Sequence, residues 1–251
     1  MRMAAQSLNG GFSGSSERRV RVADSTGQRN GFIMQERTAH TNRIGSLLVL
    51  HNLRPGITVG GRDWAAWWER HREQVPPMLR AEIEREVARL KLVKEQVRAI
   101  EAARRKEIAE GKQPLVTQLT QLRAIGPKGA WVLAKELFGW RRFANRRELA
   151  GSLGLVPTPY ASGDSQIEQG ISKAGNRRLR SLLVELAWAW LKLQPASALT
   201  QWFNRRFARS GKRMRRVGIV ALARRLAIAL WRYLQDGEIP AGACLKPTAR
   251  A

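Results

Sequence analysis

Three serines and a group of cationic residues lie close together in the sequence. The serines are Ser162, Ser165 and Ser172. The cationic group, which includes one amide, follows them and comprises Lys173, Asn176, Arg177, Arg178 and Arg180. A serine hydroxyl can attack a carbonyl carbon or a phosphorus atom, and guanidinium groups stabilise the charge of a phosphate. Because all three histidines lie in the first third of the chain, no neighbouring histidine base supports a Ser–His hydrolase. The residue types therefore favour phosphodiester chemistry over acyl transfer.

A simpler alternative assigns this stretch no chemistry at all. Ser162 and Gly163 would then form a tight turn, and the arginines would bind nucleic acid without cutting it. Taken alone, the residue types favour this alternative.

The composition indicates a globular protein with a polyanionic partner. The chain has 251 residues, 43% of them hydrophobic, a formal net charge of +25 and a sequence pI of about 11.7. From residue 140 to residue 251 there are 21 Lys and Arg against 6 Asp and Glu. Such an excess repels itself in a compact fold unless a polyanion compensates it. DNA or RNA is therefore the expected partner, and the C-terminal half is the expected site of contact.

Cysteine content and hydropathy exclude several protein classes. Cys244 is the only cysteine, which excludes an intrachain disulfide framework and a multi-cysteine metal site. No secretory signal is visible, and the apolar runs are too short to cross a membrane. We therefore expect a cytoplasmic protein that has no membrane partner.

The first half of the chain is expected to form a disordered segment followed by a helical hairpin. Residues 1–32 are rich in turn-forming residues and have no apolar periodicity. Within residues 33–112, apolar residues recur at helical spacing in two stretches. The second stretch carries a nearly heptad-like seam made of Leu79, Ile83, Val87, Leu90, Val93, Val97 and Ile100. Its partner is either the helix over 33–50 or another subunit, so we expect a coiled-coil hairpin and a homo-oligomer.

The second half is expected to form a compact helical domain over 113–236, followed by a loose tail over 237–251. A glycine turn between two apolar helices resembles a helix-hairpin-helix, in which free N–H groups at the start of the second helix bind a backbone phosphate. On this basis Gly126, Lys128 and Gly129 are candidate DNA-binding residues. No clear β-alternation appears anywhere, so the fold class is expected to be all-α.

Five motifs of the second half occur together in a fixed order. They are Leu-Arg-Ala-Ile-Gly-Pro (122–127), Phe-Ala-Asn-Arg-Arg-Glu-Leu-Ala (143–150), Gly-Leu-Val-Pro (154–157), Ser-Gly (162–163) and Gly-Ile-Ser-Lys-Ala-Gly-Asn-Arg-Arg-Leu-Arg (170–180). In this order and spacing they resemble the C-terminal domain of the DEDD-type insertion-sequence transposases, the insertion sequence 110/116/902 group. Residues 36–44 resemble the coiled-coil region that precedes that domain. The resemblance covers roughly residues 35–235.

The resemblance implies an RNA-guided DNA recombinase that moves an insertion sequence. In that family a RuvC-like domain supplies four carboxylates for magnesium ions, and a serine of the C-terminal domain attacks the DNA backbone. Ser162 matches the position of that nucleophile, and Ser165 and Ser172 are the fallback positions. Gly163 and the cationic group would bind DNA near the scissile phosphate. DNA and a guide RNA are the implied partners, and Mg²⁺ is the implied cofactor of the intact family enzyme.

The N-terminal part departs from the family pattern. Only about 32 residues precede the hairpin, too few for a sheet that carries four metal-binding carboxylates. We therefore expect a truncated member that has no metal site of its own, retains DNA and RNA binding, and is impaired in strand exchange; whether it is an enzyme is left open. The alternative is a non-catalytic, basic nucleic-acid-binding helical module. A covalent DNA adduct at Ser162 would distinguish the two.

Overall fold

The chain forms two compact units, unit 1 (Met1–Ala109) and unit 2 (Glu110–Ala251). The computed structural model describes residues 14–162 and 165–247, and for 14–30, 159–162 and 165–169 it describes the backbone alone. Almost all of the described regular structure is helical. The expected all-α fold class is therefore confirmed, apart from one small two-stranded sheet.

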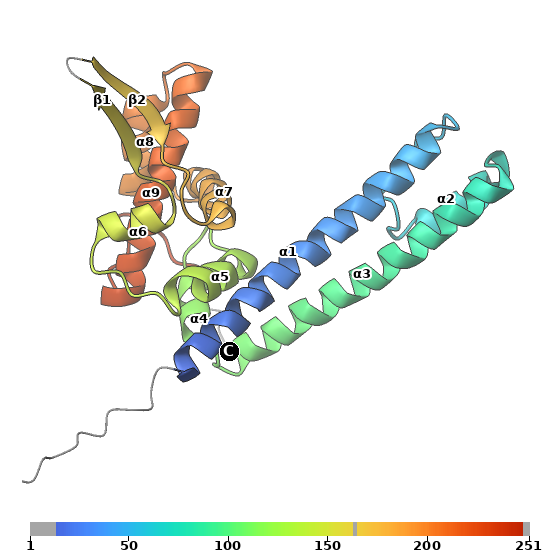
Figure 1. Ribbon diagram of the computed structural model, residues 1–251, viewed down its shortest axis with the longest axis horizontal. Coiled ribbons are helices and arrows are strands. Elements are labelled where there is room, and N and C mark those ends of the chain that lie inside the picture. The colour runs from blue at the N-terminus through green and yellow to red at the C-terminus, as the bar shows by residue number, and fades with distance from the viewer. Residues whose placement is uncertain (1–13, 163–164, 248–251) are drawn as a thin grey trace, which may run out of the picture. The chain divides into compact units, whose positions relative to one another are not determined.

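Unit 1 is a helical hairpin closed by a short helix. Two long helices, α1 (Gly14–Val49) and α3 (Pro77–Ala109), lie side by side, and α2 (Trp64–His71) lies in the connection between them (Figure 1). A single 3-10 turn, Arg72–Gln74, follows α2. The seam expected for the second helix therefore has its partner within the same chain, in α1.

The core of unit 1 consists of apolar residues at helical spacing. Ile44 and Leu48 of α1 face Ile83 and Leu90 of α3, and all four are fully buried or nearly so. Near the middle of α3, the ammonium of Lys94 donates hydrogen bonds to the carbonyls of Val59 and Gly60, at 3.2 and 2.6 Å. Burial of the apolar seam thus supplies most of the stability of this unit, at roughly 25 cal/mol per Å² of apolar area.

One acidic residue lies inside this apolar seam. The side chain of Glu86 is only 1% exposed, and its carboxylate contacts His40 Nδ1 at 2.6 Å, the Arg43 guanidinium at 2.9 Å and the Arg89 guanidinium. Burial by itself would raise the pKa of the Glu86 carboxyl. The hydrogen bonds from His40, Arg43 and Arg89 outweigh that effect and lower the pKa to about 2. Glu86 therefore stays ionised, and the surrounding cations compensate its charge.

Helix α1 begins earlier than the sequence predicts. We expected disorder over 1–32, whereas the helical backbone starts at Gly14. The start of the helix does not require an apolar stripe, because a helix that is anchored by packing further along can continue into a polar segment. Residues 1–13 lie outside the described part of the chain.

Unit 2 is a bundle of short and medium helices with one β-hairpin (Figure 1). Its elements are α4 (Pro114–Gln121), α5 (Pro127–Leu133), a π-helical turn (Ala134–Phe138), α6 (Arg146–Ser152), β1 (Pro157–Ser162), β2 (Ser165–Ile171), α7 (Arg177–Leu193), α8 (Ala198–Phe207) and α9 (Lys212–Asp236). Helices α7 and α9 pack against each other and form the centre of the unit. None of the described helices, α9 included, has the length and hydropathy needed to cross a membrane.

Side-chain caps define where the helices of unit 2 begin. The side chain of Asn145 accepts hydrogen bonds from the N–H groups of Arg147 and Glu148 at the start of α6. The hydroxyl of Ser197 accepts one from the N–H of Leu199 at the start of α8. A cap of this kind contributes about 1 kcal/mol. The α9 helix ends at Asp236, and Gly237 takes the left-handed conformation (φ +73°) that commonly follows a helix.

The β-hairpin is the main element that the sequence analysis did not predict. Strands β1 and β2 are antiparallel, and their register runs from Pro157 opposite Ile171 to Ser162 opposite Ser165, with an irregularity between Pro157 and Pro159. Two prolines in one strand favour an extended backbone but remove ladder donors. They obscure the alternating pattern by which strands are recognised in sequence.

The segment after α9 is tied to the body of unit 2 rather than loose. The amide of Gln194, fully buried, donates to the carbonyls of Arg123 and Cys244 at 2.9 Å each, and its oxygen accepts from the Cys244 N–H at 2.7 Å. The Lys246 ammonium donates to the carbonyls of Thr120 and Ile125. The expectation of a loose tail over 237–251 is therefore wrong up to residue 247. Hydrogen bonds, and not apolar packing, hold this segment in place, which is why its apolar content did not predict the order.

Candidate nucleic-acid interface

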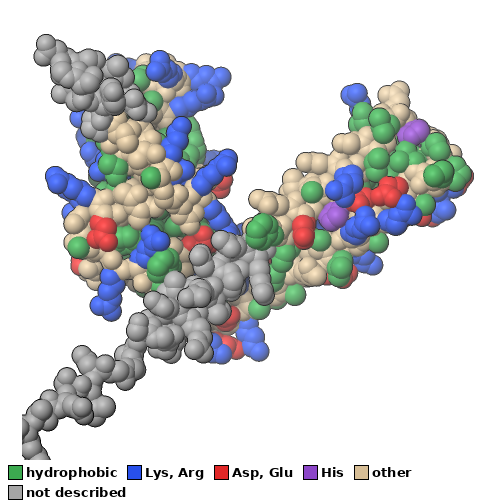
Figure 2. Space-filling model, in the orientation of Figure 1, with side chains coloured by type: hydrophobic (Ala, Val, Ile, Leu, Met, Phe, Trp, Pro, Cys, Tyr) green, Lys and Arg blue, Asp and Glu red, His purple; other side chains and the backbone are tan. Residues whose placement is uncertain are grey.

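The excess positive charge of the chain is concentrated in unit 2. Residues 110–251 contain 25 Lys and Arg against 8 Asp and Glu, whereas residues 1–109 contain 20 against 12. On unit 1, acidic side chains lie next to basic ones (Figure 2). The partner of the charge excess should therefore contact unit 2.

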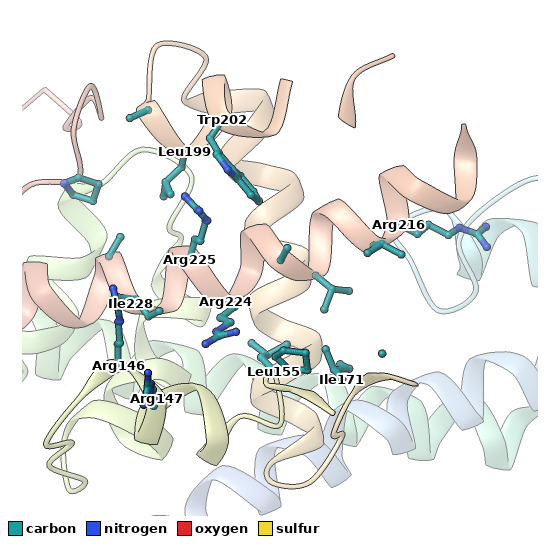
Figure 3. A pocket seen from close by; sticks show the side chains of 18 of the residues that line it. Arg146, Arg147, Leu155, Ile171, Leu199, Trp202, Arg216, Arg224, Arg225 and Ile228 are labelled. Carbon is teal, nitrogen blue, oxygen red and sulfur yellow. The ribbon is translucent and has the colours of Figure 1, made fainter. Parts of the chain in front are cut away.

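A large cleft on unit 2 gathers much of this charge. Its volume is about 1490 Å³, and it is bordered by α6, the base of the β-hairpin, α8, α9 and the segment after α9 (Figure 3). Nine basic residues line it, namely Arg146, Arg147, Lys173, Lys212, Arg213, Arg216, Arg224, Arg225 and Arg232. The single acidic residue in the lining is Glu238. Within the part of the chain that the structure describes, no ion pair joins any of the nine to an acid.

Helix α9 contributes more residues to the cleft than any other element. It can do so because one of its faces packs against the core and the other is left at the surface. One face is buried against the core and contains Leu222, Leu226 and Leu230. The other face lines the cleft with residues at spacings of three and one: 213, 216, 217, 220, 221, 224, 225, 228, 229 and 232. Spacings of this kind follow one side of a helix. A single helix thus connects the core to the charged surface.

A tryptophan and two arginines form a cluster in the cleft. The Arg225 guanidinium lies 4.0 Å from the centre of the Trp202 ring, and the Arg206 guanidinium lies 5.9 Å from it. Figure 3 shows Arg225 directed toward Trp202 and Leu199, and Arg224 toward Leu155 on the other side of α9. Burial, followed by repulsion from Arg206 and Arg224, lowers the pKa of Arg225. Like charges held this close favour the binding of an anion.

Gly154 and Gly175, from the motifs over 154–157 and 170–180, allow two turns beside the cleft to pack closely. Gly154 and Gly175 both have left-handed backbones, with φ of +64° and +96°. A Cβ on Gly154 would overlap the Ala174 carbonyl oxygen, and a Cβ on Gly175 would overlap the Ser152 carbonyl oxygen. The turn before β1 and the turn after β2 therefore pack backbone to backbone, which only glycine permits. This contact positions the base of the hairpin beside the start of α7.

The predicted nucleophile lies on the hairpin that borders the cleft. Ser162 is the last residue of β1 and pairs with Ser165, the first residue of β2. The side chains of both serines, and Gly163 entirely, lie outside the described residues. Ser172 follows β2, is half-buried, and donates its N–H to the Val156 carbonyl at 2.8 Å. The assignment of Ser162 as the nucleophile stays a prediction.

The predicted cationic group divides into residues that support the fold and residues that face solvent. The Asn176 side chain caps α7, and Arg178 forms an ion pair with Glu136 at 3.1 Å. The Arg180 guanidinium donates to the Leu153 carbonyl at 3.1 Å. Lys173 lines the cleft, and Arg177 is exposed at the start of α7. Of the group, only Lys173 therefore belongs to the cleft.

The predicted helix-hairpin-helix turn lies at the start of α5. Gly126 is the N-cap of that helix, and Gly126 and Lys128 are both exposed. Gly129 is buried, and a Cβ added to it would lie 3.4 Å from Leu186 of α7. Gly129 thus allows α5 to approach α7. Phosphate binding by this turn stays a prediction.

The residues of α6 and α9 are the functional candidates that the sequence analysis missed. Arg146 and Arg147 belong to the motif over 143–150, but the sequence assigned them no binding role. Arg224, Arg225 and Arg232 lie in a helix whose apolar content indicates burial. The available signal was that several basic residues of α9 recur on one side of the helix, away from its buried leucines.

The described residues do not match the metal site that the resemblance implies. Among them, no three His, Cys, Asp or Glu side chains lie close enough together to hold a metal ion. The four-carboxylate site that the resemblance implies is therefore not found among the described residues.

Comparison with known proteins gives one consistent result. Residues 116–202 match the transposase family IS116/IS110/IS902. The chain is 38% identical over 229 residues to "Putative transposase y4rJ" of Sinorhizobium fredii, covering 85% of this chain and 57% of that protein. It is 29% identical over 211 residues to the transposase for insertion sequence element IS1328 of Yersinia enterocolitica, covering 82% of this chain and 61% of that protein. The chain thus spans about six tenths of the length of these curated relatives.

Proposed function

We propose that this chain, whose residues 116–202 match the transposase family IS116/IS110/IS902, binds the DNA of an insertion sequence in the basic cleft of unit 2. The observation that carries the proposal is the ratio of nine basic residues to one acidic residue around a single cleft. Each cation that neutralises a phosphate releases a condensed counterion, which supplies most of the sequence-independent affinity for DNA. A cleft with this lining would hold the sugar-phosphate backbone.

We further propose that Ser162 is the nucleophile of strand exchange. Its Oγ would attack the phosphorus of a DNA phosphodiester and form a new P–O bond, while the bond from phosphorus to one deoxyribose oxygen breaks. The serine proton passes to solvent, and the released deoxyribose oxygen takes up a proton to become a hydroxyl. Attack by another DNA hydroxyl reverses the step and frees the serine. The motif match of Ser162, and the cleft lining by Thr158 and Gly170 at the base of its hairpin, support this proposal.

The covalent step is tested with a suicide DNA substrate whose leaving strand is lost after cleavage. In the full-length or complemented protein we expect a DNA–protein adduct, and no adduct when that protein carries Ser162→Ala. Ser165→Ala and Ser172→Ala are matched controls that remove a nearby hydroxyl and should leave labelling intact. An adduct that persists in Ser162→Ala and is lost in one of the controls would move the nucleophile to that residue. DNA binding without any adduct would favour the non-catalytic binding module.

Binding is tested separately from chemistry by titrating a labelled duplex at several salt concentrations. We expect log K to fall linearly with log salt, by about 0.9 for each phosphate neutralised. A structured RNA added as competitor tests the proposed RNA binding. Gel-filtration mass tests the homo-oligomer that we propose to form through the hairpin of unit 1.

A further inference from the structure

The basic cleft contains more apolar surface than binding of a continuous duplex requires. A duplex presents its phosphates outward and keeps its base faces stacked inside, so cations alone can hold it. This cleft is also lined by apolar side chains that remain at least partly exposed, namely Ile171, Leu199, Val217, Val220 and Ile228. Val217 is 52% exposed. Apolar side chains left in water beside arginines are explained if the ligand covers them with an apolar face.

Cationic and apolar residues alternate along the face of α9 that lines the cleft. Arg213 and Arg216 are followed by Val217 and Val220, the pair at 224–225 is basic again, Ile228 and Ala229 are apolar, and Arg232 is basic. Each repeat of about eight residues spans about 12 Å along the helix axis. An unpaired polynucleotide strand likewise presents both charged phosphates and bases whose faces are free.

The Trp202 cluster supplies a stacking surface in this cleft. The ring is half-buried and lies against Phe207 in an edge-on contact of 5.7 Å, which holds its orientation. The Arg225 guanidinium stacks on the same ring system at 4.0 Å. Unpaired bases stack both on aromatic rings and on the planes of arginine guanidiniums. The Trp202 ring and the Arg225 guanidinium therefore form a short stack to which an unpaired base can be added.

The size of the cleft indicates a polymer. Its volume of about 1490 Å³ exceeds the range of roughly 300–1,000 Å³ that is usual for small-molecule sites. We infer that the cleft binds an unpaired stretch of polynucleotide, with one or more bases stacked on Trp202 and Arg225 and the phosphates held by the surrounding cations. This inference deepens the proposed function and rests on it.

The test uses the intact chain and synthetic strands. We compare a thymidine oligonucleotide, an abasic oligonucleotide of the same length, and a duplex that contains the same thymidine strand. The abasic strand retains every phosphate and lacks the bases. We expect it to bind about 5- to 100-fold more weakly than the thymidine strand, because stacking contributes about 1–3 kcal/mol per base. Equal affinity of the thymidine and abasic strands would overturn the inference without any protein variant.

The stacking residue is identified with matched tryptophan variants. Trp202→Ala should reduce the affinity for the thymidine strand about 5- to 100-fold and leave the affinity for the abasic strand unchanged. Trp140→Ala is the control, because Trp140 is also exposed and also lies beside an arginine, Arg141 at 4.4 Å, yet does not line the cleft. A loss of the same size in both variants, or a loss for both strands in Trp202→Ala, would contradict the assignment. Trp202→Phe, which retains a ring, should recover most of the affinity and controls for folding.

The outcomes separate this inference from the proposed function. If no strand or duplex binds with a salt-dependent affinity, the proposed function itself fails. If the duplex binds with the expected salt dependence and neither Trp202→Ala nor removal of the bases matters, only the inference fails. A ribouridine strand assayed alongside the thymidine strand distinguishes RNA from DNA as the source of the unpaired stretch, and tighter binding of either supports a single-strand site.

Discussion

The two units of the molecule use arginine in opposite ways. In unit 1, arginines are matched by acids: Arg43 and Arg89 contact the buried Glu86, and Arg80 pairs with Glu73 at 3.0 Å. In unit 2, no ion pair among the described residues joins an arginine of the cleft to an acid, and burial together with neighbouring like charges lowers the pKa of Arg225. Arginine in unit 1 therefore stabilises the fold, whereas arginine in the cleft is available to the ligand that we propose. Local pairing, more than total charge, identifies the interface.

The largest change is expected from breaking the scaffold that holds the cleft together. Gly175→Ala should destabilise unit 2 by about 4 kcal/mol, because the left-handed backbone is strained for alanine and the new Cβ overlaps the Ser152 carbonyl. Thermal unfolding measured by calorimetry checks this. Gly151→Ala is the control, since a Cβ there meets nothing within 4 Å, and it should be neutral or stabilise by up to about 1 kcal/mol. Equal effects of the two substitutions would contradict the backbone-to-backbone packing of the turn before β1 against the turn after β2.

Removal of three charges from the cleft should have the next largest effect, and this effect is on the affinity for DNA. A variant with Arg146→Gln, Arg224→Gln and Arg225→Gln should reduce the salt slope of DNA binding by about 2 to 3 and the affinity at about 0.1 M salt by about 100-fold or more. The matched control removes three charges from unit 1, at Arg72, Arg80 and Arg85, and should leave both quantities nearly unchanged. Fluorescence anisotropy of a labelled duplex measures both. Similar losses in both variants would mean that the contrast between the units has no bearing on binding.

The buried acid of unit 1 should make stability depend on pH. The folded pKa of Glu86, about 2, lies below its ordinary value of 4.5. Its contribution, on the order of 3 kcal/mol, is therefore complete above about pH 4.5 and is lost as the pH falls from there toward 2. Urea unfolding between pH 7 and pH 3 measures this loss. Glu86→Gln should remove most of the pH dependence in that window, and an unaltered pH profile in the variant would show that another carboxyl is responsible.

A smaller effect is expected where α8 and α9 approach most closely. A Cβ on Gly218 would lie 2.5 Å from Cγ of Phe207. Gly218→Ala should therefore cost about 1–2 kcal/mol as the ring moves aside. Because Phe207 contacts Trp202, the same substitution should weaken binding of the thymidine strand by a few-fold. Calorimetry and anisotropy on one preparation test both effects, and a stable variant that binds normally would show that Phe207 does not position Trp202.

Much of the helical fold could be predicted from the sequence, whereas most of the cleft could not. The seam from Leu79 to Val93 predicts α3 because burial of apolar residues imposes the helical period on the sequence. Asn176, by contrast, was expected to bind DNA, whereas its side chain caps α7. The β-hairpin was missed because its pairing depends on tertiary context and its prolines obscure alternation. The cleft was missed because its arginines come from helices that are far apart in sequence, and their convergence is a property of packing.

The buried carboxylate in the hairpin has a further geometric consequence. Two helices joined by a nearly heptad-like seam can slide past each other by one turn, about 5.4 Å, and still bring apolar residues into contact. Glu86 removes that freedom, because in the observed alignment His40 and Arg43 reach its carboxylate, and a slipped alignment would strand the charge among leucines. A single buried acidic residue thus fixes one register between the two helices, and with it the length of the hairpin.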